Sequence, residues 1–398
     1  MSSATDIHFE RGGGEAWRNP FPMYRALRDN APLIEVRDGD YWVLSRWQDV
    51  FDALIDTATF SSASGLTTDY RDMLEMGLEA PIVMMDPPDH TAVRKLGVKQ
   101  FTPRRVRDIE AMVRGFVVER IERLREAGEG DIVAELFKPL PSLVVAHFLG
   151  VPDDVRDRFD NWTESTVSAN AEGDIVAHGA KAVAEMFGLF TELIEKRRKE
   201  PREDLFSALV HAQIDGEPVS MARILGFGFT MVTGGNDTVT GLLGSASQVL
   251  TEHPDARAYL AANPGAIPKA VEEFLRLVGP LQALARTTTR EVTLHDQTIP
   301  VGKRVLLLYG SANRDQREFG PDSERFEVDR KIRRHVGFGY GSHHCIGAAT
   351  ARLQARVVLE ELLARCPEFG VDSAKGRYAP GPHVRRFESL PFTAKASG

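Results

Sequence analysis

One cysteine lies in a glycine-rich loop near the C-terminal end of the chain, and a helix-forming stretch follows it directly. Cys345 stands in the run VGFGYGSHHCIG, residues 336–347, in which three of five consecutive residues are glycine. Glycine lets a backbone adopt positive φ and approach a large planar ligand closely. Residues 348–357 are good or tolerable helix formers, so the sulfur should lie near a helix N-terminus, where the helix dipole favours a thiolate. The pattern predicts a single sulfur held against a flat cofactor.

Other interpretations of the cysteine loop fit less well. A lone cysteine is ordinarily a small buried hydrophobe, and we assign that role to the second cysteine, Cys366. His343 and His344 beside Cys345 suggest zinc, but adjacent residues point apart and no CxxC or HxxxH spacing accompanies them. The glycine spacing is not GxGxxG and no GKS or GKT follows, which excludes a nucleotide-binding loop.

The loop resembles the cysteine-ligand signature of cytochromes P-450, FGxGxHxCxG. Every fixed position of that signature is filled here, from Phe338 and Gly339 through His343 to Cys345 and Gly347. The resemblance implies that Cys345 is the axial thiolate ligand of the iron of haem b, and that the other four residues contact or shape the cofactor site. Loop N–H groups directed at the sulfur would tune the redox potential of the iron.

Composition places the chain among ordinary globular proteins and excludes several functions. The hydrophobic share is 42% and the charged share 27%, and no apolar stretch reaches the ~18 residues of a membrane span. The N-terminal segment has neither the basic nor the apolar region of a secretory signal, and two distant cysteines fit a reducing compartment. We therefore expect a cytoplasmic protein. The net charge of −8 argues against general nucleic-acid binding.

The chain has no repeat, low-complexity block or glycine/serine linker, so residues 20–398 are expected to form one mainly α domain with small β-sheets. Residues 1–19 are expected to be a flexible arm. The remaining expected elements are a hairpin over 33–47, long helices over 104–127 and 177–199, extended segments over 281–310, a coil over 311–335, a helix over 346–365 and a tail with strands.

A long helix interrupted by glycines is expected over residues 220–253, with Ser220 as N-cap and Pro254 as the stop. Each interior glycine costs about 1 kcal/mol relative to alanine, so repeated glycines indicate something close against the helix backbone. They are Gly226, Gly228, Gly234, Gly235, Gly241 and Gly244. The Thr238 hydroxyl can reach the Gly234 carbonyl, which would disturb the helix and open a groove for water or O2. Ordinary helix packing through small residues is the alternative.

The segment from Gly234 to Thr238 is similar to the oxygen-activation motif of the cytochromes P-450, [AG]GxDT. By that resemblance Asp237 would relay protons and Thr238 would hold dioxygen and its waters. Gly234 would lie against the cofactor.

Glu273 and Arg276 lie three residues apart on a predicted helix and can meet. A solvated pair is the ordinary interpretation of such a spacing. In cytochromes P-450, however, a Glu–Arg pair at this place before the cysteine loop locks the fold behind the haem. The third member of that lock is usually an arginine in a PERF-like segment. Here residues 323–326 read SERF, so Arg325 is the predicted third member and Arg330 is its rival.

The two propionates of haem need cationic hydrogen-bond donors. Residues 86–90, DPPDH, read as a helix start with the first aspartate as cap, which places His90 and Arg94 on one helix face. A solvated face is the ordinary interpretation, but the stretch resembles the DPPxHxxxR segment of the family, which binds propionates. Arg286 and His343 match two further propionate-binding positions.

The resemblance covers residues 20–392 and implies the triangular-prism fold and the monooxygenase chemistry of soluble cytochromes P-450. One atom of O2 would be inserted into a C–H bond of a small to medium hydrophobic substrate such as a terpenoid, steroid, fatty acid or aromatic compound. Without a flavin or nicotinamide motif, electrons must come from a separate ferredoxin with its NAD(P)H-dependent reductase. Two alternatives are a peroxide-using peroxygenase, disfavoured by the intact Asp237–Thr238 pair, and a non-catalytic haem-binding sensor.

Two further expectations concern surfaces. Four arginines flanking the loop could form a basic docking face, although scattered surface charge explains them equally well: Arg333, Arg334, Arg352 and Arg356. The substrate pocket is expected, by family position, to be lined from segments 62–85, 163–185, 227–234, 281–285 and 384–387, which are mostly apolar. Their named apolar residues are Leu66, Met84, Phe227, Phe229, Val232, Leu281 and Leu284.

Overall fold

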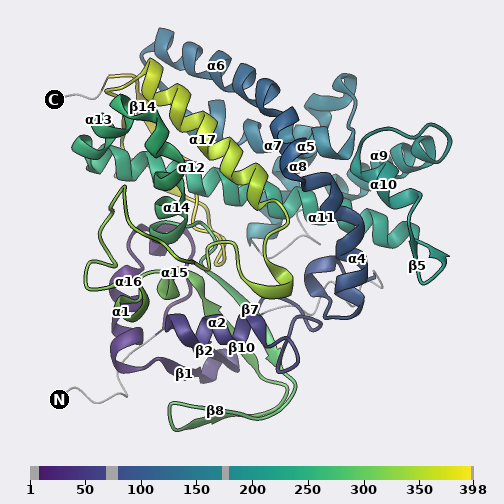
Figure 1. Cartoon of the computed structure of the whole chain (residues 1–398), viewed down its shortest axis with the longest axis vertical. Helices are drawn as coiled ribbons and strands as arrows, with labels where there is room; N and C mark the ends of the chain where they lie inside the picture. Colours follow the sequence, from purple (N-terminus) through teal and green to yellow (C-terminus); the bar gives the residue numbers. More distant parts are fainter. Residues whose placement is uncertain (1–8, 69–78, 173–178, 396–398) are drawn as a thin grey trace.

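The computed structural model describes residues 9–68, 79–172 and 179–395, with the side chains of 170–172 left out. Helices fill the upper and right parts of the view in Figure 1, and the strands β1, β2, β7, β8 and β10 lie together at the bottom. The expected mainly α fold with small sheets is confirmed. None of the described helices is long and apolar enough to cross a membrane.

The helices account for most of the described chain. In order they are α1 (Phe21–Asn30), α2 (Trp47–Ile55), α4 (Asp89–Val98), α5 (Pro103–Asp108), α6 (Glu110–Ala127), α7 (Pro139–Leu149), α8 (Arg156–Glu172), α9 (Ala180–Lys199), α10 (Leu205–Val210), α11 (Met221–Gly235), α12 (Asp237–Glu252), α13 (Pro254–Ala262), α14 (Ile267–Leu277), α15 (Tyr309–Ala312), α16 (Gln316–Phe319) and α17 (Ala348–Arg365).

The strands are short and lie in several small sheets. They are β1 (Leu33–Val36), β2 (Tyr41–Leu44), β3 (Phe60–Ser61), β4 (Glu129–Asp131), β5 (Gln213–Ile214), β6 (Glu217–Pro218), β7 (Ala283–Thr288), β8 (Val292–Leu294), β9 (Gln297–Ile299), β10 (Arg304–Leu308), β11 (Gly370–Val371), β12 (Arg377–Tyr378), β13 (Phe387–Ser389) and β14 (Pro391–Thr393). The largest sheet has the order β1-β2-β10-β7-β3.

The predicted hairpin over residues 33–47 is confirmed, since β1 pairs antiparallel with β2. The turn between the two strands contains Asp38, Gly39 and Asp40. Asp40, not Gly39, takes the left-handed conformation, with φ of 51°. Gly39 is needed for space instead, because a Cβ there would lie 2.3 Å from the Tyr41 ring.

Two large hydrophobic clusters hold the helical part together. One gathers apolar side chains from α6, α7, α12, α14 and α17, and the other gathers those of α7 to α11. Met231 on α11 and Ile346, which follows Cys345, pack against both clusters. The cysteine loop is thereby brought beside α11. Burial of this apolar surface is the main favourable term for the fold.

The N-terminal arm packs more tightly than expected. Trp17, in the 3-10 turn Gly14–Arg18, is 1% exposed, and its Nε1 donates a hydrogen bond to the Gly381 carbonyl at 2.7 Å. Burying an indole is favourable enough to order a segment rich in glycine. The prediction of a loose arm is therefore wrong for residues 9–19, and residues 1–8 lie outside the described chain.

Several predicted boundaries shift. The helix expected over 104–127 is two helices, α5 and α6, which separate at Ile109. The helix expected over 177–199 corresponds to α9. Residues 177 and 178, the first two of the expected range, lie outside the described chain. The last long helix, α17, begins at Ala348 rather than 346.

The position of Asp86 before α4 suggested that its side chain caps the helix, but it does not. Its carboxylate accepts hydrogen bonds from the Ser61 hydroxyl and the Ser62 N–H group instead. Only its backbone carbonyl reaches the helix, where it accepts from the His90 N–H group at 2.9 Å. Asp86 therefore ties the start of α4 to β3, a contact that the local sequence does not reveal.

The Glu273–Arg276 pair forms and is completely buried. Two parallel hydrogen bonds of 2.7 Å join the groups, and both side chains have 0% exposure. Arg276 also donates to the carbonyls of Asn313 and Ser323, at 2.8 and 2.6 Å. Removing one partner of such a buried pair is strongly destabilising. The pair thus fixes α14 against the coil that follows α15.

Arg330, not Arg325, completes this network. Arg330 Nε donates to Glu273 Oε1 at 3.0 Å, and its side chain is 9% exposed. The Arg325 side chain is 80% exposed and pairs with Asp322 at 3.3 Å. The choice of Arg325 from the SERF segment is therefore wrong, because the chain turns its carbonyl rather than its side chain toward Arg276.

Replacing Arg330 by glutamine should lower the free energy of unfolding by about 1.5–3 kcal/mol, because a buried carboxylate loses a charged hydrogen-bond partner. The matched control, Arg325→Gln, should change it by less than about 0.5 kcal/mol. Urea unfolding of both variants, followed by circular dichroism, measures the difference. Equal effects from the two substitutions would contradict this assignment.

Candidate functional site

The cysteine loop has a compact hydrogen-bonded backbone. The Cys345 N–H group donates to the Phe338 carbonyl at 2.8 Å, and Gly339 N–H donates to the Val336 carbonyl at 2.9 Å. The turn Gly341–His343 lies between these bonds. Cys345 ends the loop three residues before α17 begins, so the sulfur lies close to the N-terminal end of that helix.

Cys345 is an exposed residue, although protein atoms crowd its thiol on several sides. Burial raises the pKa of the Cys345 thiol. The Gly347 N–H group and the guanidinium groups of Arg94 and Arg352 lower that pKa. These donors and charges are the kind that stabilise a thiolate once it coordinates a metal. Cys366, in contrast, is buried, as predicted.

The four glycines of the loop serve different purposes. Gly339 and Gly341 have φ of 65° and 67°, the left-handed conformation that glycine favours. Gly337 is needed for close packing, because a Cβ there would lie 2.7 Å from the Leu275 carbonyl of α14. A Cβ at Gly347 would lie 3.9 Å from the Cys345 sulfur. The loop is therefore fitted to the helix behind it and leaves space around the sulfur.

The long glycine-rich helix breaks where expected. Ser220 caps α11, and the chain leaves regular helix at Asn236 before α12 begins. The Thr238 hydroxyl donates to the Gly234 carbonyl at 2.9 Å, and the Asn236 amide donates to the Val232 carbonyl at 2.7 Å. Such bonds from side chain to backbone compete with the helix ladder and bend it.

The surroundings of each helix glycine show whether it is needed for packing or leaves the helix surface open. Val145, Phe190 and Phe206 fill the places where side chains at Gly235 and Gly228 would stand, and the C-terminal tail does so at Gly241 and Gly244. Helix packing, the alternative considered for these glycines, therefore explains most of them. Gly234 differs, since it is exposed and none of the described residues lies within 4 Å of its missing Cβ. The open side of the helix is thus at the break, beside Thr238.

Asp237 turns away from this open side. The residue is 7% exposed and its Oδ1 lies 2.5 Å from Arg386 Nε. Burial raises the pKa of Asp237 to about 6, against the lowering effects of Arg386 and Lys138. Arg386 was missed in the sequence, because the only signal for it is a contact across some 150 residues of chain.

A cluster of basic side chains forms near the loop, as predicted. The rings of His90 and His343 lie 4.2 Å apart. Burial, and next Arg286, lower the pKa of His343 to about 3, and burial and Arg94 lower the pKa of His90. Arg286, on β7, is 2% exposed and donates to the Ala285 carbonyl.

The cluster fits an anionic ligand. Within the described residues, His90 Nδ1 and His343 Nε2 are buried without a hydrogen-bond partner, which is costly unless a further group binds them. The carboxylate of Asp86, which acts on both rings, is itself held by serine groups on β3. Arg94 lies near Cys345 and donates to the His344 carbonyl. Donors crowded near the cysteine loop fit the propionates of a haem, and an exposed cysteine in that loop fits its ligand.

A zinc interpretation gains no support. Within the ranges 9–68, 79–172 and 179–395, no group of three or more His, Cys, Asp or Glu side chains could hold a metal ion. His343 and His344 flank the sulfur in sequence, but the His343 ring lies against that of His90.

The apolar residues expected to line the substrate pocket differ in burial. Five of the named apolar residues are half-buried: Leu66, Met84, Phe229, Leu281 and Leu284. Phe227 and Val232 are buried in the core instead, and the Phe227 ring lies on α4 at Gly97. Residues 69–78 and 173–178 of the expected lining lie outside the described chain.

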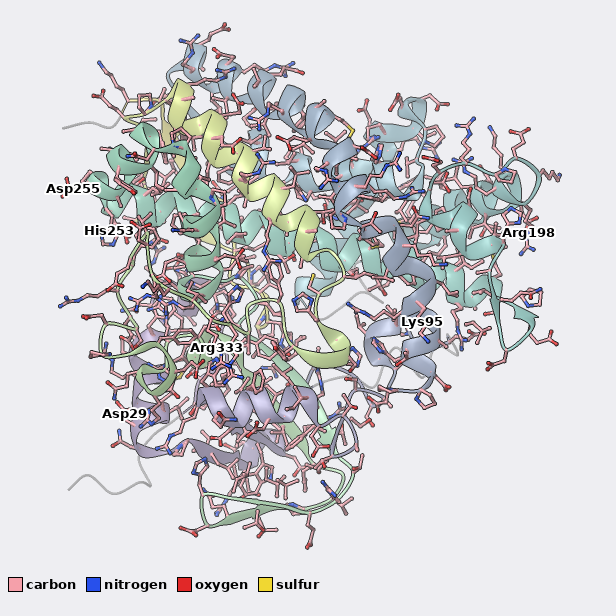
Figure 2. All side chains as sticks on the ribbon, in the orientation of Figure 1. Asp29, Lys95, Arg198, His253, Asp255 and Arg333 are labelled. Carbon is pink, nitrogen blue, oxygen red and sulfur yellow. The ribbon has the colours of Figure 1, made fainter. Side chains whose placement is uncertain are left out.

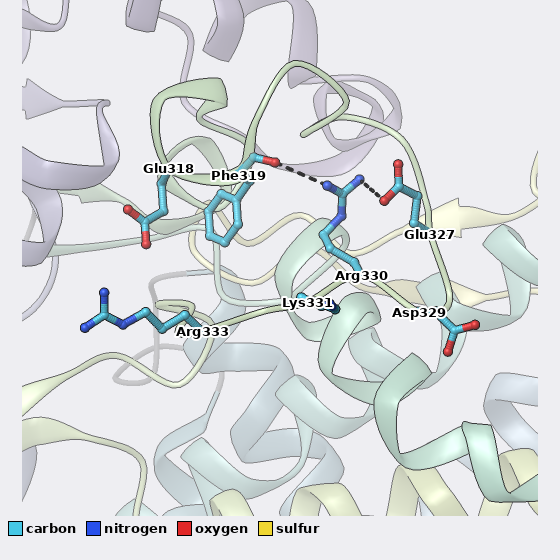
Figure 3. Close-up of a pocket in the computed structure, with 7 residues that line it drawn as sticks. All are labelled: Glu318, Phe319, Glu327, Asp329, Arg330, Lys331 and Arg333. Carbon is cyan, nitrogen blue, oxygen red and sulfur yellow. Dashed lines mark hydrogen bonds and ion pairs between the residues drawn. The ribbon is translucent and has the colours of Figure 1, made fainter.

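A separate hollow of about 330 Å³ lies along the segment from Glu318 to Arg333. Figure 3 shows Arg330 reaching across it from the Phe319 carbonyl to the Glu327 carboxylate. Its lining is mostly charged, so it suits neither an apolar substrate nor a haem.

The predicted basic docking face is largely neutralised. Arg352 pairs with Glu272 at 2.6 Å, Arg356 pairs with Glu110 at 2.7 Å, and Arg334 lies over the Trp47 ring. Arg333 is exposed, and Figure 2 shows it left of the centre of the view, apart from Lys95 on α4. Scattered surface charge, the alternative interpretation, therefore describes most of these arginines.

Comparison with known proteins finds similarity to one part of the chain and to nearly all of it. The family model described as "Cytochrome P450" matches residues 267–372, which include Glu273 and Cys345. Cytochrome P450 130 of Mycobacterium tuberculosis (strain ATCC 25618 / H37Rv) is 53% identical over 401 residues, covering 98% of this chain and 99% of the relative.

Two further similarities extend over nearly the whole chain. Vitamin D(3) 25-hydroxylase of Pseudonocardia autotrophica is 34% identical, covering 96% of this chain and 95% of the relative. The crystal structure of CYP109E1 from Bacillus megaterium in complex with testosterone has a TM-score of 0.85 at 29% identity, covering 95% of this chain and 100% of that chain.

Replacing Arg286 by leucine should weaken haem binding by about ten- to a hundredfold, because a hydrogen bond to a charged group contributes about 1.5–3 kcal/mol. Haem dimethyl ester, which lacks the carboxylates, should bind wild type and variant equally. Equilibrium titration of the apoprotein with each porphyrin measures both affinities. Arg290→Leu, at a 69% exposed arginine after the same strand, is the control. An equal loss for both porphyrins would contradict the assignment.

Proposed function

We propose that this protein is a monooxygenase that inserts one atom of O2 into a C–H bond of a small to medium hydrophobic molecule. The chain belongs to the cytochrome P450 family, and the proposal follows from that membership. The overall reaction consumes the substrate, O2, two electrons and two protons, and yields the hydroxylated product and water. The observation that carries the proposal is that Cys345 is exposed in the same loop as His343. The His343 Nε2 and the Nδ1 of the neighbouring His90 ring are buried without a hydrogen-bond partner among the described residues.

We propose haem b as the cofactor. When bound through Cys345, it would supply the binding and activation of O2, which a strongly donating thiolate favours. His90, Arg94, Arg286 and His343 would hold its two propionates. Phe338, Gly339 and Gly347 would shape the loop: Phe338 accepts the Cys345 N–H bond, Gly339 has positive φ, and Gly347 leaves room at the sulfur.

Asp237 and Thr238 are proposed to deliver protons. Thr238 stands at the helix break, where its hydroxyl is half-buried and already ordered by Gly234. A carboxyl with a pKa of about 6 exchanges protons readily near neutral pH, which is the property required of a general acid. Gly234 keeps the space beside the hydroxyl open.

The proposed substrate is a terpenoid, steroid, fatty acid or aromatic compound. Half-buried apolar residues at the expected lining positions support a hydrophobic class. The names of two relatives, a vitamin D(3) hydroxylase and a protein crystallised with testosterone, favour the polycyclic members of that class.

We further propose that electrons come from a ferredoxin and its NAD(P)H-dependent reductase, that the protein works in the cytoplasm, and that residues 20–398 act as a single haem-thiolate domain. Family membership implies a redox partner. Two free cysteines fit a reducing compartment.

Titration of the holoprotein with pools of hydrophobic compounds, followed by turnover with a ferredoxin, its reductase and NAD(P)H, tests the function. A shift of the haem from low to high spin and a product that carries one oxygen from O2 are expected. Turnover with hydrogen peroxide alone would favour a peroxygenase. Haem binding without product formation in any of these systems would favour a non-catalytic haem-binding sensor.

Replacing Thr238 by alanine should leave the haem spectrum unchanged and lower the product formed per electron pair severalfold, because the ordered hydroxyl at the helix break is lost. The missing electrons should appear as hydrogen peroxide. Parallel assays of NAD(P)H, product and peroxide measure the coupling. Thr251→Ala removes the same kind of bond to a carbonyl four residues back and should stay coupled. Full coupling in Thr238→Ala would refute the role.

A further inference from the structure

The C-terminal tail lies against a stripe of small residues on α12. A Cβ at Gly241 would lie 2.7 Å from the Arg385 carbonyl, and one at Gly244 would lie 3.1 Å from the Phe387 ring. Asp237 is one helical turn before Gly241, so it belongs to the same face. The glycines of this face therefore admit the backbone of residues 385–387 next to the Asp237 carboxylate.

Arg386 is the tail residue that meets this carboxylate. Its Nε lies 2.5 Å from Asp237 Oδ1, and its side chain is 3% exposed. Backbone bonds fix the tail at this point, because the Arg385 N–H group donates to Pro280 and the Arg386 carbonyl accepts from Ala379.

Few other charges face Asp237. Lys138, between the π-helix Val133–Phe137 and α7, acts on it more weakly than Arg386 does, and Lys138 already pairs with Glu164 at 3.1 Å. Arg386 therefore supplies the principal counter-charge to Asp237 among the described residues.

The two adjacent arginines of the tail, Arg385 and Arg386, differ in their hydrogen-bond partners. Arg385 donates to the Trp17 carbonyl, the Ser245 hydroxyl and the Tyr378 hydroxyl. Arg386 forms the ion pair with Asp237, and its Nε and Nη1 make no hydrogen bond within the part of the chain that the structure describes. Arg385 thus serves the fold, whereas the charge of Arg386 faces the acid.

We propose that Arg386 is a positioning residue for proton delivery, which holds the Asp237 carboxylate on the tail side of α12. This inference rests on the proposed role of Asp237 in the reaction. The cation attracts the ionised carboxylate, so it counteracts the burial of that carboxylate and keeps both protonation states of the acid accessible near neutral pH.

Removing the cation should shift the titration of Asp237. An opposite charge at this range changes a carboxyl pKa by about 1–3 units, so Arg386→Gln should raise the titration midpoint of Asp237 by about that amount. Arg386→Lys keeps the charge and should restore the midpoint. Arg386→Met, which retains an apolar stem, is the second variant if the glutamine variant does not fold.

Infrared difference spectra of the holoenzyme across pH provide the test. The carbonyl band of a protonated carboxyl that is absent in Asp237→Asn reports this acid without turnover. We expect a wild-type midpoint at a pH of about 6, a higher midpoint in Arg386→Gln or Arg386→Met, and a return in Arg386→Lys. Arg385→Gln, the adjacent control, should lower stability without moving the midpoint.

An unchanged midpoint in both charge-removing variants would overturn the inference, and so would an equal shift in Arg385→Gln. The titration result does not depend on whether the protein proves to be a monooxygenase. Should the wild-type enzyme form no product with any electron source, the monooxygenase proposal fails, while the titration still decides whether Arg386 controls Asp237.

Discussion

The buried ion pair of Glu273 and Arg276 is the interaction on which the rest of the structure depends. A carboxylate and a guanidinium with no exposure are tolerable only when every donor and acceptor is used. Here Arg330 and the carbonyls of the following coil complete the set. The same helix, α14, presents the Leu275 carbonyl against which Gly337 packs. The pair therefore fixes the platform on which the cysteine loop rests, and so the position of the sulfur.

Two groups of polar side chains mark the proposed functional region. His90 Nδ1 and His343 Nε2 are buried without a hydrogen-bond partner among the described residues, and Asp237 is paired with Arg386. The histidine nitrogens are available to a cofactor, and the buried acid is available to exchange a proton. The acid, Asp237, lies on α12 at the helix break. The basic cluster comes from α4, β7 and the Cys345 loop.

Local motifs could be predicted from the sequence, whereas contacts between distant segments could not. The cysteine loop, the Thr238–Gly234 bond and the Glu273–Arg276 pair depend on spacings of a few residues, and these contacts are present. The third member of the lock depends on how a coil folds back, so the SERF segment indicated Arg325 where Arg330 makes the contact. Asp86, Trp17 and Arg386 were misjudged or missed for the same reason. Most helix glycines serve packing, and only the open surroundings of Gly234 distinguish it.

Ligation of the haem iron by the Cys345 sulfur is the central claim, and the ferrous–carbon monoxide spectrum of the purified holoprotein tests it most directly. We predict a thiolate-type spectrum in wild type that persists in Cys366→Ser, because that buried cysteine lies in the core away from the loop. The spectrum should be lost in Cys345→Ser. A Cys345→Ser protein with an unchanged spectrum would contradict the account.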